Sequence, residues 1–206
     1  MVARNLVFWE VDTQKDFMLP GGKLYVPGAE RLLPNIRTLT DAARQGRVFL
    51  VSHGCYHTKD DPEFATFPPH CVKGTAGAGF VPEALAEKVV TVPNHPAATL
   101  LQDLSQYQQI LLEKQTLDIF ASLRADELVK RFDPDTEFVV FGVVTEFCVR
   151  FAAKGLLDRG RRVSVVRDAI ETLNPQDGQR TISELQASGA RFISTRQALE
   201  LLDGCN

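Results

Sequence analysis

The sequence predicts an α/β protein in which helices cover both faces of a parallel sheet, giving three layers. Short apolar segments rich in β-branched and aromatic residues recur along the chain, and helical patterns separate most of them. Polar and apolar residues do not alternate regularly in these segments, as expected for strands that are buried on both faces. The predicted strands are Leu6 to Val11, Arg47 to Ser52, Lys88 to Val92, Gln109 to Leu112, Glu137 to Val143, Arg162 to Val166 and Arg191 to Ser194.

The helical patterns follow the strands in chain order. They are clearest at Glu30 to Gln45, Ala125 to Phe132, Glu146 to Arg159, Asp177 to Ser188 and Arg196 to Leu202. The first strand contains an exception to the apolar rule, because Glu10 lies on the same face as Asp12 in a segment that should be buried. A buried carboxylate needs a cation or a proton, and we expect a basic side chain on the neighbouring strand or on a partner subunit.

Length and composition limit the classes of protein to consider. With 206 residues, 44% of them hydrophobic, the chain suits one domain spanning residues 1–206. The net charge of -3 gives no basic field for a nucleic-acid backbone, so we expect no nucleic-acid partner. The apolar run Leu6 to Trp9 is too short for a secretory segment or a membrane span, and a cytoplasmic address without membrane association is the default expectation.

Four cysteines in a chain of this size do not predict a disulfide scaffold. Cys55, Cys71, Cys148 and Cys205 form no CxxC pair, and we expect them to be reduced. A redox role for Cys148 is a weaker hypothesis, because no second cysteine lies at short sequence spacing from it.

Polar and nucleophilic residues follow several of the predicted strands. Asp12, the segment Ser52 to His57, Lys114 and the segment Thr145 to Cys148 all lie at this position. Ligands of open parallel sheets bind beyond the carboxyl ends of the strands, so the fold should bring these residues to one edge. The long irregular segment from Gly54 to Gly79 is also expected to be functional.

The chemistry of three of these residues fits nucleophilic catalysis. Cys148 lies where a strand leads into a helix, and a thiol in the first helical turn is favoured as thiolate. Asp12 can carry the thiol proton, and the charge of Lys114 would lower the pKa of both neighbours. Each residue also has an ordinary interpretation: a buried apolar cysteine, a capping aspartate and a solvated lysine.

Four motifs resemble those of the isochorismatase-like cysteine hydrolase family, and of its nicotinamidases in particular. They are Val-Asp-Thr-Gln-Lys-Asp-Phe ending at Phe17, Phe67-Pro-Pro-His-Cys-Val-Lys-Gly-Thr-Ala-Gly77, Glu113-Lys114 and Gly142-x-x-Thr-x-x-Cys148-Val149. The resemblance runs from about Leu6 to about Ser194. It implies a six-stranded parallel sheet and an Asp-Lys-Cys triad of Asp12, Lys114 and Cys148.

The resemblance also implies further site residues. An oxyanion hole would use the backbone N–H groups of Cys148 and Val144, the latter after a cis peptide bond at Val143-Val144. Phe17 and Phe67 would sandwich a flat substrate ring, although both also suit ordinary core packing.

Nicotinamidases of this kind hold a divalent metal through an Asp-x-His pair and a later histidine, but here the pair is Cys55-Tyr56-His57. With His70, and with Glu63 as an additional ligand, thiolate, imidazole and carboxylate would suit zinc. The cysteine could equally abolish the site, leaving the histidines to hydrogen-bond within a polar loop. The ligand set is also open, since His53, Asp60 and Asp61 are alternatives.

The function that the resemblance implies is hydrolysis of a small carboxamide, nicotinamide to nicotinate and ammonia, through a cysteine thioester. One alternative is a metal-independent relative acting on another small amide or ureido compound. Another is a catalytically silent binding domain, which has no physical reason to keep Asp12, Lys114 and Cys148 together. Relatives are commonly homo-oligomers, which this sequence alone does not indicate.

Overall fold

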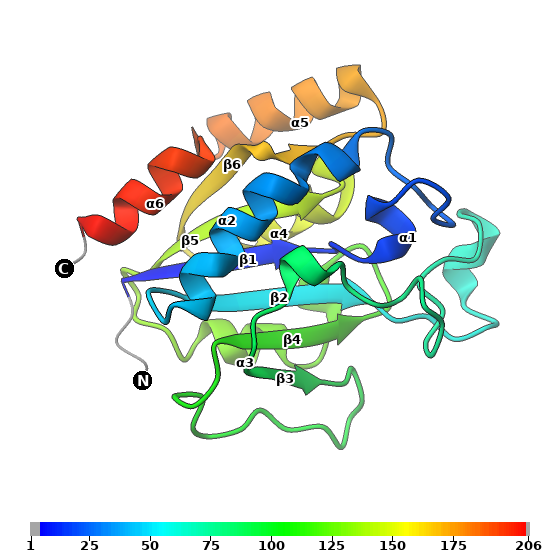
Figure 1. Cartoon of the computed structure of the whole chain (residues 1–206), viewed down its shortest axis with the longest axis horizontal. Coiled ribbons are helices and arrows are strands. Elements are labelled where there is room, and N and C mark those ends of the chain that lie inside the picture. Colours follow the sequence, from blue (N-terminus) through cyan, green and yellow to red (C-terminus); the bar gives the residue numbers. More distant parts are fainter. Residues whose placement is uncertain (1–4, 205–206) are drawn as a thin grey trace.

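The computed structural model describes residues 5–204, and Cys205 lies outside this range. Parallel strands form one sheet in the order β3-β4-β2-β1-β5-β6-β7 (Figure 1). Seven strands are present where the family resemblance implied six, so that count was wrong. The apolar segments themselves had indicated all seven. The strands are β1 (Leu6–Val11), β2 (Phe49–Cys55), β3 (Val89–Val92), β4 (Gln109–Lys114), β5 (Glu137–Val143), β6 (Arg162–Glu171) and β7 (Arg191–Ile193).

Helices cover both faces of this sheet and confirm the three-layer prediction. The helices are α1 (Lys15–Met18), α2 (Leu33–Arg44), α3 (Ala125–Val129), α4 (Arg150–Asp158), α5 (Pro175–Ala187) and α6 (Thr195–Asp203). One apolar cluster packs α2 and α6 against the face seen from the front in Figure 1, and a second packs α3, α4 and α5 against the other face. Short 3₁₀ turns lie at Ala29–Leu32, Pro62–Ala65, Pro82–Ala84 and Ile119–Ala121.

Two strands that end at the site extend further than their apolar patterns indicated, and β6 likewise continues beyond Val166 to Glu171. β2 continues through His53 and Gly54 to Cys55, and β4 continues to Lys114. The two strands stay in register to the end, where Cys55 pairs with Lys114. Ladder pairing with a neighbouring strand therefore outweighs the loss of apolar side chains, and it fixes these two residues side by side.

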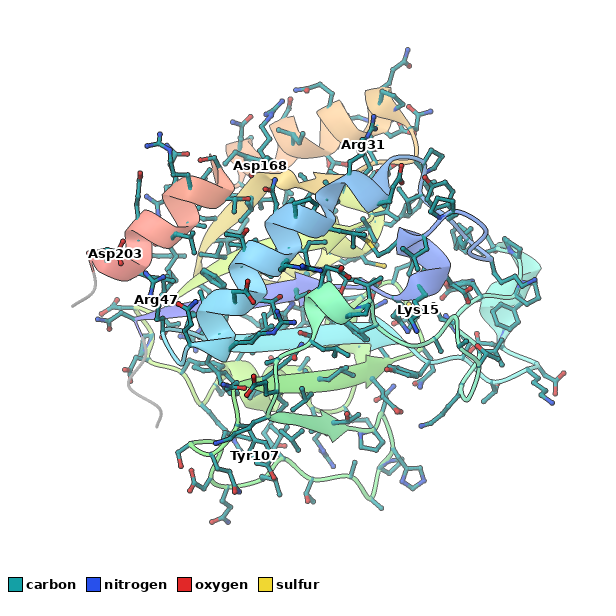
Figure 2. All side chains as sticks on the ribbon, viewed as in Figure 1. Lys15, Arg31, Arg47, Tyr107, Asp168 and Asp203 are labelled. Atoms are coloured by element: carbon teal, nitrogen blue, oxygen red, sulfur yellow. The ribbon has the colours of Figure 1, made fainter. Side chains whose placement is uncertain are left out.

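Polar contacts attach α6 to the sheet. Asp168 of β6 accepts hydrogen bonds from the backbone N–H and the hydroxyl of Thr195, at 2.7 and 2.9 Å. Arg47, in the turn before β2, pairs with Asp203 at the other end of the helix at 2.7 Å (Figure 2). Both ends of α6 are thus held over the same face as α2.

Glu10 is fully buried, and its neighbours differ from the basic partner that we predicted. The Ser52 hydroxyl donates a hydrogen bond of 2.6 Å to the carboxyl group, and the Gln109 amide lies 3.4 Å from the same oxygen. No ion pair of Glu10 occurs within residues 5–204. Burial raises the pKa of Glu10 to about 8. A proton, rather than a cation, neutralises this carboxyl group at neutral pH.

No helix in the described part of the chain is both long enough and apolar enough to span a bilayer.

Candidate active site

The ends of three central strands bring Asp12, Lys114 and Cys55 together. Asp12 follows β1 in a left-handed conformation with φ of 49°, and its backbone N–H donates to the carbonyl of His53 at 3.0 Å. A non-glycine residue with positive φ is uncommon and needs support from its surroundings. The hydrogen bond to β2 provides this support and turns the carboxylate into the space beyond the sheet edge.

Cys148 reaches the same space from the next segment. It lies in a π-helical turn, Thr145–Val149, that leads from β5 into α4. We had expected an α-helix beginning at Glu146, but the first turn is wider. Such turns occur mostly as single-turn bulges in α-helices and are frequent at functional sites. The Thr145 hydroxyl donates to the carbonyl of Glu171 at 2.8 Å and so holds the start of this turn against β6.

Lys114 is the buried cation at the centre of the cluster. Its Nζ lies 2.9 Å from Asp12 Oδ2, 2.8 Å from Cys55 Sγ and 3.5 Å from Cys148 Sγ. Burial alone lowers the pKa of Lys114, but the neighbouring anionic groups, Asp12 first, outweigh burial and raise it well above its usual value. The lysine therefore remains charged although its side chain is fully buried.

The two thiols beside Lys114 differ in acidity. A hydrogen bond from the Cys148 thiol, together with the charge of Lys114, lowers the pKa of Cys55 well below its usual value. The same hydrogen bond and burial raise the pKa of Cys148. This direction is opposite to the one we predicted for Cys148 from its position at a helix start. The lysine stabilises one thiolate, on the nearer sulfur, and Cys148 needs a base to lose its proton.

Cys55 also belongs to a second cluster with His57 and His70. The ligand atoms of these three buried side chains all lie within 4.8 Å of one another. Burial lowers the pKa of His57, but the hydrogen bond and charge of Cys55 raise it to about 9. Within residues 5–204, Nε2 of His57 and of His70 are buried, and apart from the contact with the Cys55 sulfur neither nitrogen has a hydrogen bond of good geometry. One sulfur and two imidazoles with free nitrogens fit a divalent metal such as zinc.

The other proposed metal ligands lie differently. Glu63 Oε1 is 3.9 Å from His70 Nε2, next to the cluster but outside the group of three. Asp61 contacts Nδ1 of His57 at 3.0 Å, as a carboxylate that orients the imidazole would. His53, an alternative ligand, instead lies 3.4 Å from Asp12 Oδ1.

A small pocket of about 20 Å³ lies next to both clusters and is lined by Cys55, His70 and Cys148 among others. This volume holds about one water molecule, so a six-membered ring requires side chains at its wall to move. Phe17 and Phe67 both line the pocket, and Phe67 meets Phe147 edge to face at 5.9 Å. The lining is mostly apolar: Phe17, Leu24, Cys55, Glu63, Phe67, His70, Leu117, Val144, Phe147, Cys148 and Leu173.

Gln14 and Asp16 hold this site together, and sequence reasoning did not single them out. The Gln14 amide accepts from the backbone N–H of Cys55 and donates to its carbonyl, both at 2.7 Å. Asp16 accepts from the backbone N–H of Cys71 at 2.7 Å, next to His70. The available signal was a run of polar residues directly after a buried strand, which must find partners inside the protein.

Glu146 holds the wall that carries Leu173. Its carboxylate accepts from the backbone N–H groups of Leu173 and Asn174, at 2.9 and 2.8 Å, and from the hydroxyl of Thr172 at 2.6 Å. Because Glu146 lies two residues before Cys148, this wall of the pocket and the thiol share one support.

Comparison with known proteins agrees with this geometry. The Isochorismatase domain matches residues 6–197, nearly the whole chain. The chain belongs to the isochorismatase-domain family. A nicotinamidase of Escherichia coli (strain K12) is 26% identical over 207 residues, covering 89% of this chain and 92% of that protein.

Two solved structures share the isochorismatase-family fold. One is an isochorismatase-like hydrolase from Alkaliphilus metalliredigens, with a TM-score of 0.76, 23% identity and coverage of 96% of this chain and 98% of the other. The other is a pyrazinamidase of Pyrococcus horikoshii in complex with zinc, with a TM-score of 0.72, 23% identity and coverage of 92% and 99%.

The peptide bond between Val143 and Val144 in this isochorismatase-family chain is cis. It lies at the end of β5, immediately before the turn that carries Cys148. The backbone N–H of Val144 therefore belongs to the same short segment as the thiol, and Val144 itself lines the pocket.

Proposed function

We propose that this isochorismatase-family chain is an amidohydrolase that converts nicotinamide to nicotinate and ammonia through a thioester on Cys148. Membership of the family and the nicotinamidase relatives support a hydrolase that acts on an amide C–N bond. The observation that carries the proposal is the position of the Lys114 ammonium. This buried group lies within 3.5 Å of both the Asp12 carboxylate and the Cys148 sulfur, and Cys148 lines an apolar pocket.

The residues divide the reaction between them. Asp12 takes the proton of Cys148, whose raised pKa makes such a base necessary. The sulfur adds to the carboxamide carbon, and ammonia leaves with the proton from Asp12. Water then hydrolyses the thioester, with Asp12 again accepting a proton. Lys114 keeps the Asp12 carboxylate close to the Cys148 sulfur. Its positive charge balances the negative charge of these two groups in every step.

The tetrahedral oxygen needs hydrogen-bond donors. We assign this role to the backbone N–H groups of Val144 and Cys148, and the position of Val144 directly before the π-helical turn of Cys148 supports this assignment. Each such donor lowers the barrier by about 3 kcal/mol in comparable enzymes. Phe17 and Phe67 would hold the flat ring from the apolar walls.

A divalent metal belongs to the same proposal. Cys55, His57 and His70 would hold it, and Glu63 stands near enough to contribute through a water. The zinc complex of the Pyrococcus horikoshii pyrazinamidase supports zinc as the ion. When bound, the metal would supply a Lewis-acidic position for the pyridine nitrogen and so orient the carboxamide toward Cys148.

Ammonia release from nicotinamide tests the proposal. Wild type, Cys148→Ala and the control Cys71→Ala are assayed as purified, after chelation and after zinc is restored. Cys71 is buried but does not line the pocket, so its variant controls for the loss of a thiol. We expect activity in wild type and the control, restored by zinc after chelation, and none in Cys148→Ala.

A different result redirects or refutes the assignment. Equal ammonia release by Cys148→Ala and wild type would refute the thioester mechanism. Inactivity of the wild type toward nicotinamide under every metal condition would refute nicotinamide as substrate. Activity toward a carbamoylated amine without metal would then support the alternative of a metal-independent hydrolase of ureido compounds, which the replacement of aspartate by Cys55 favours.

A further inference from the structure

Cys55 and Cys148 meet at one amine although they lie far apart in the sequence. Both sulfurs are within 3.5 Å of Lys114 Nζ, one from the end of β2 and the other from the turn after β5. The sequence has no second cysteine close to Cys148, but the fold brings Cys55 next to it. The Cys148 thiol also donates a hydrogen bond to the sulfur of Cys55, so the two sulfurs are in direct contact, as a resolving cysteine requires.

The two sulfurs also line the same pocket. Its volume of about 20 Å³ admits a molecule of about the size of water. Hydrogen peroxide is only slightly larger than water, whereas glutathione and other thiol reagents are much larger than the pocket. Cys148 and Cys55 are 5% and 1% exposed, so only a small oxidant reaches them without moving the walls.

We propose that Cys55 and Cys148 form an intramolecular disulfide when the protein meets hydrogen peroxide. In the first step one thiol takes one oxygen from the peroxide, the O–O bond breaks, and a sulfenic acid and water form. In the second step the other thiol attacks the oxidised sulfur, the S–O bond breaks, and the disulfide and a second water form. Overall, two thiols lose two hydrogen atoms and one peroxide becomes two waters, whichever sulfur is oxidised first.

The disulfide removes two groups at once. It takes away the sulfur of Cys148 as nucleophile and the sulfur of Cys55 as a metal donor, so the oxidised protein should lose both hydrolysis and metal binding. It also protects Cys148 from further oxidation to the sulfinic acid, which thiol reductants do not reverse. This modification rests on the two sulfurs alone and goes beyond the proposed amide hydrolysis.

Mass spectrometry tests the modification without reference to any substrate. The full chain is reduced, treated with a chelator, exposed to hydrogen peroxide, alkylated at its remaining thiols and digested under non-reducing conditions. We expect the peptide that contains Cys55 to be linked to the peptide that contains Cys148. The intact oxidised protein should be lighter than the reduced protein by two hydrogen atoms, and dithiothreitol should reverse the change.

Two variants define the outcome further. Cys71→Ala should form the link as wild type does. Cys55→Ser should form no link, and its Cys148 should advance to a sulfinic acid that dithiothreitol does not restore. If Cys55→Ser fails to fold, the peptide map of the wild type decides by itself.

Three results would overturn the proposal. They are a sulfinic acid on Cys148 in the wild type without any link, a link of Cys148 to a cysteine other than Cys55, and a link of either cysteine to the peptide that contains Lys114. Inactivity toward nicotinamide would affect only the proposed function and would leave this test unchanged.

Discussion

Replacing Glu10 by glutamine should change how the stability of the protein depends on pH. The pKa of Glu10 is about 8 in the folded protein and 4.5 for an ordinary glutamate, because the carboxyl group is completely buried. Between these two values the folded state binds more protons than the unfolded state, so the free energy of unfolding falls as pH rises. The slope for one group is about 1.4 kcal/mol per pH unit.

At pH 7 the cost of keeping Glu10 protonated is about 3 kcal/mol, and at pH 4.5 it is close to zero. Glu10→Gln removes this titration while keeping the shape of the side chain. The new amide has its own cost, because Glu10 Oε1 is buried without a hydrogen-bond partner within residues 5–204. That cost is independent of pH. The stability of the variant relative to wild type should therefore rise by about 3 kcal/mol from pH 4.5 to pH 7.

Urea unfolding at a series of pH values measures this difference. The variant Glu87→Gln, which loses an exposed carboxylate outside the site, controls for the change in net charge. Parallel stability curves for wild type and Glu10→Gln, separated by a constant amount at every pH, would refute the reasoning. They would mean that Glu10 is ionised inside the folded protein, with positive charge such as that of Arg44 offsetting the effect of burial.

Three further changes test the site. Lys114→Met should abolish ammonia release. It should also lower the free energy of unfolding by about 3–5 kcal/mol near neutral pH, since the Asp12 charge stays buried without its partner. Unfolding curves that match those of the wild type would contradict this. Cobalt(II) added to the protein should give a sulfur-to-metal absorption band that disappears in Cys55→Ala, and a band of equal intensity in the variant would exclude Cys55 as ligand. Leu173→Ala should lower KM for carboxamides on larger rings with little change in kcat, because Leu173 lines the pocket and is not among the residues proposed to carry the chemistry. A fall in kcat alone would count against its role as a wall.

Much of the fold was predictable because buried parallel strands carry long apolar segments with few polar interruptions. All seven strands were found from this pattern, and β1 and β5 with their observed bounds. The ends of β2, β4 and β6 were missed because pairing continues through or beyond polar residues there. The count of six came from the resemblance and not from the residues.

The site was predictable to the extent that it depends on strand order. Asp12 and Lys114 follow or end strands, so their convergence follows from the topology. The contact of Cys55 with Lys114 depends on strand register, and the acidity of each thiol depends on distances within the cluster. No sequence pattern gives these quantities. The same holds for Gln14, whose function depends on the backbone of Cys55 across the adjacent strand.

The support that Glu146 gives to the loop of Leu173 has a consequence for how a substrate enters. This wall of the pocket is connected to the Cys148 thiol, since Glu146 and Cys148 share a helical turn. If the loop opened, it would also shift the sulfur and disturb the alignment on which the reaction depends. Entry should therefore use another part of the lining, such as Phe67, which belongs to the long segment between β2 and β3. The gate and the catalytic machinery would then be separate parts of the chain, free to change independently in evolution.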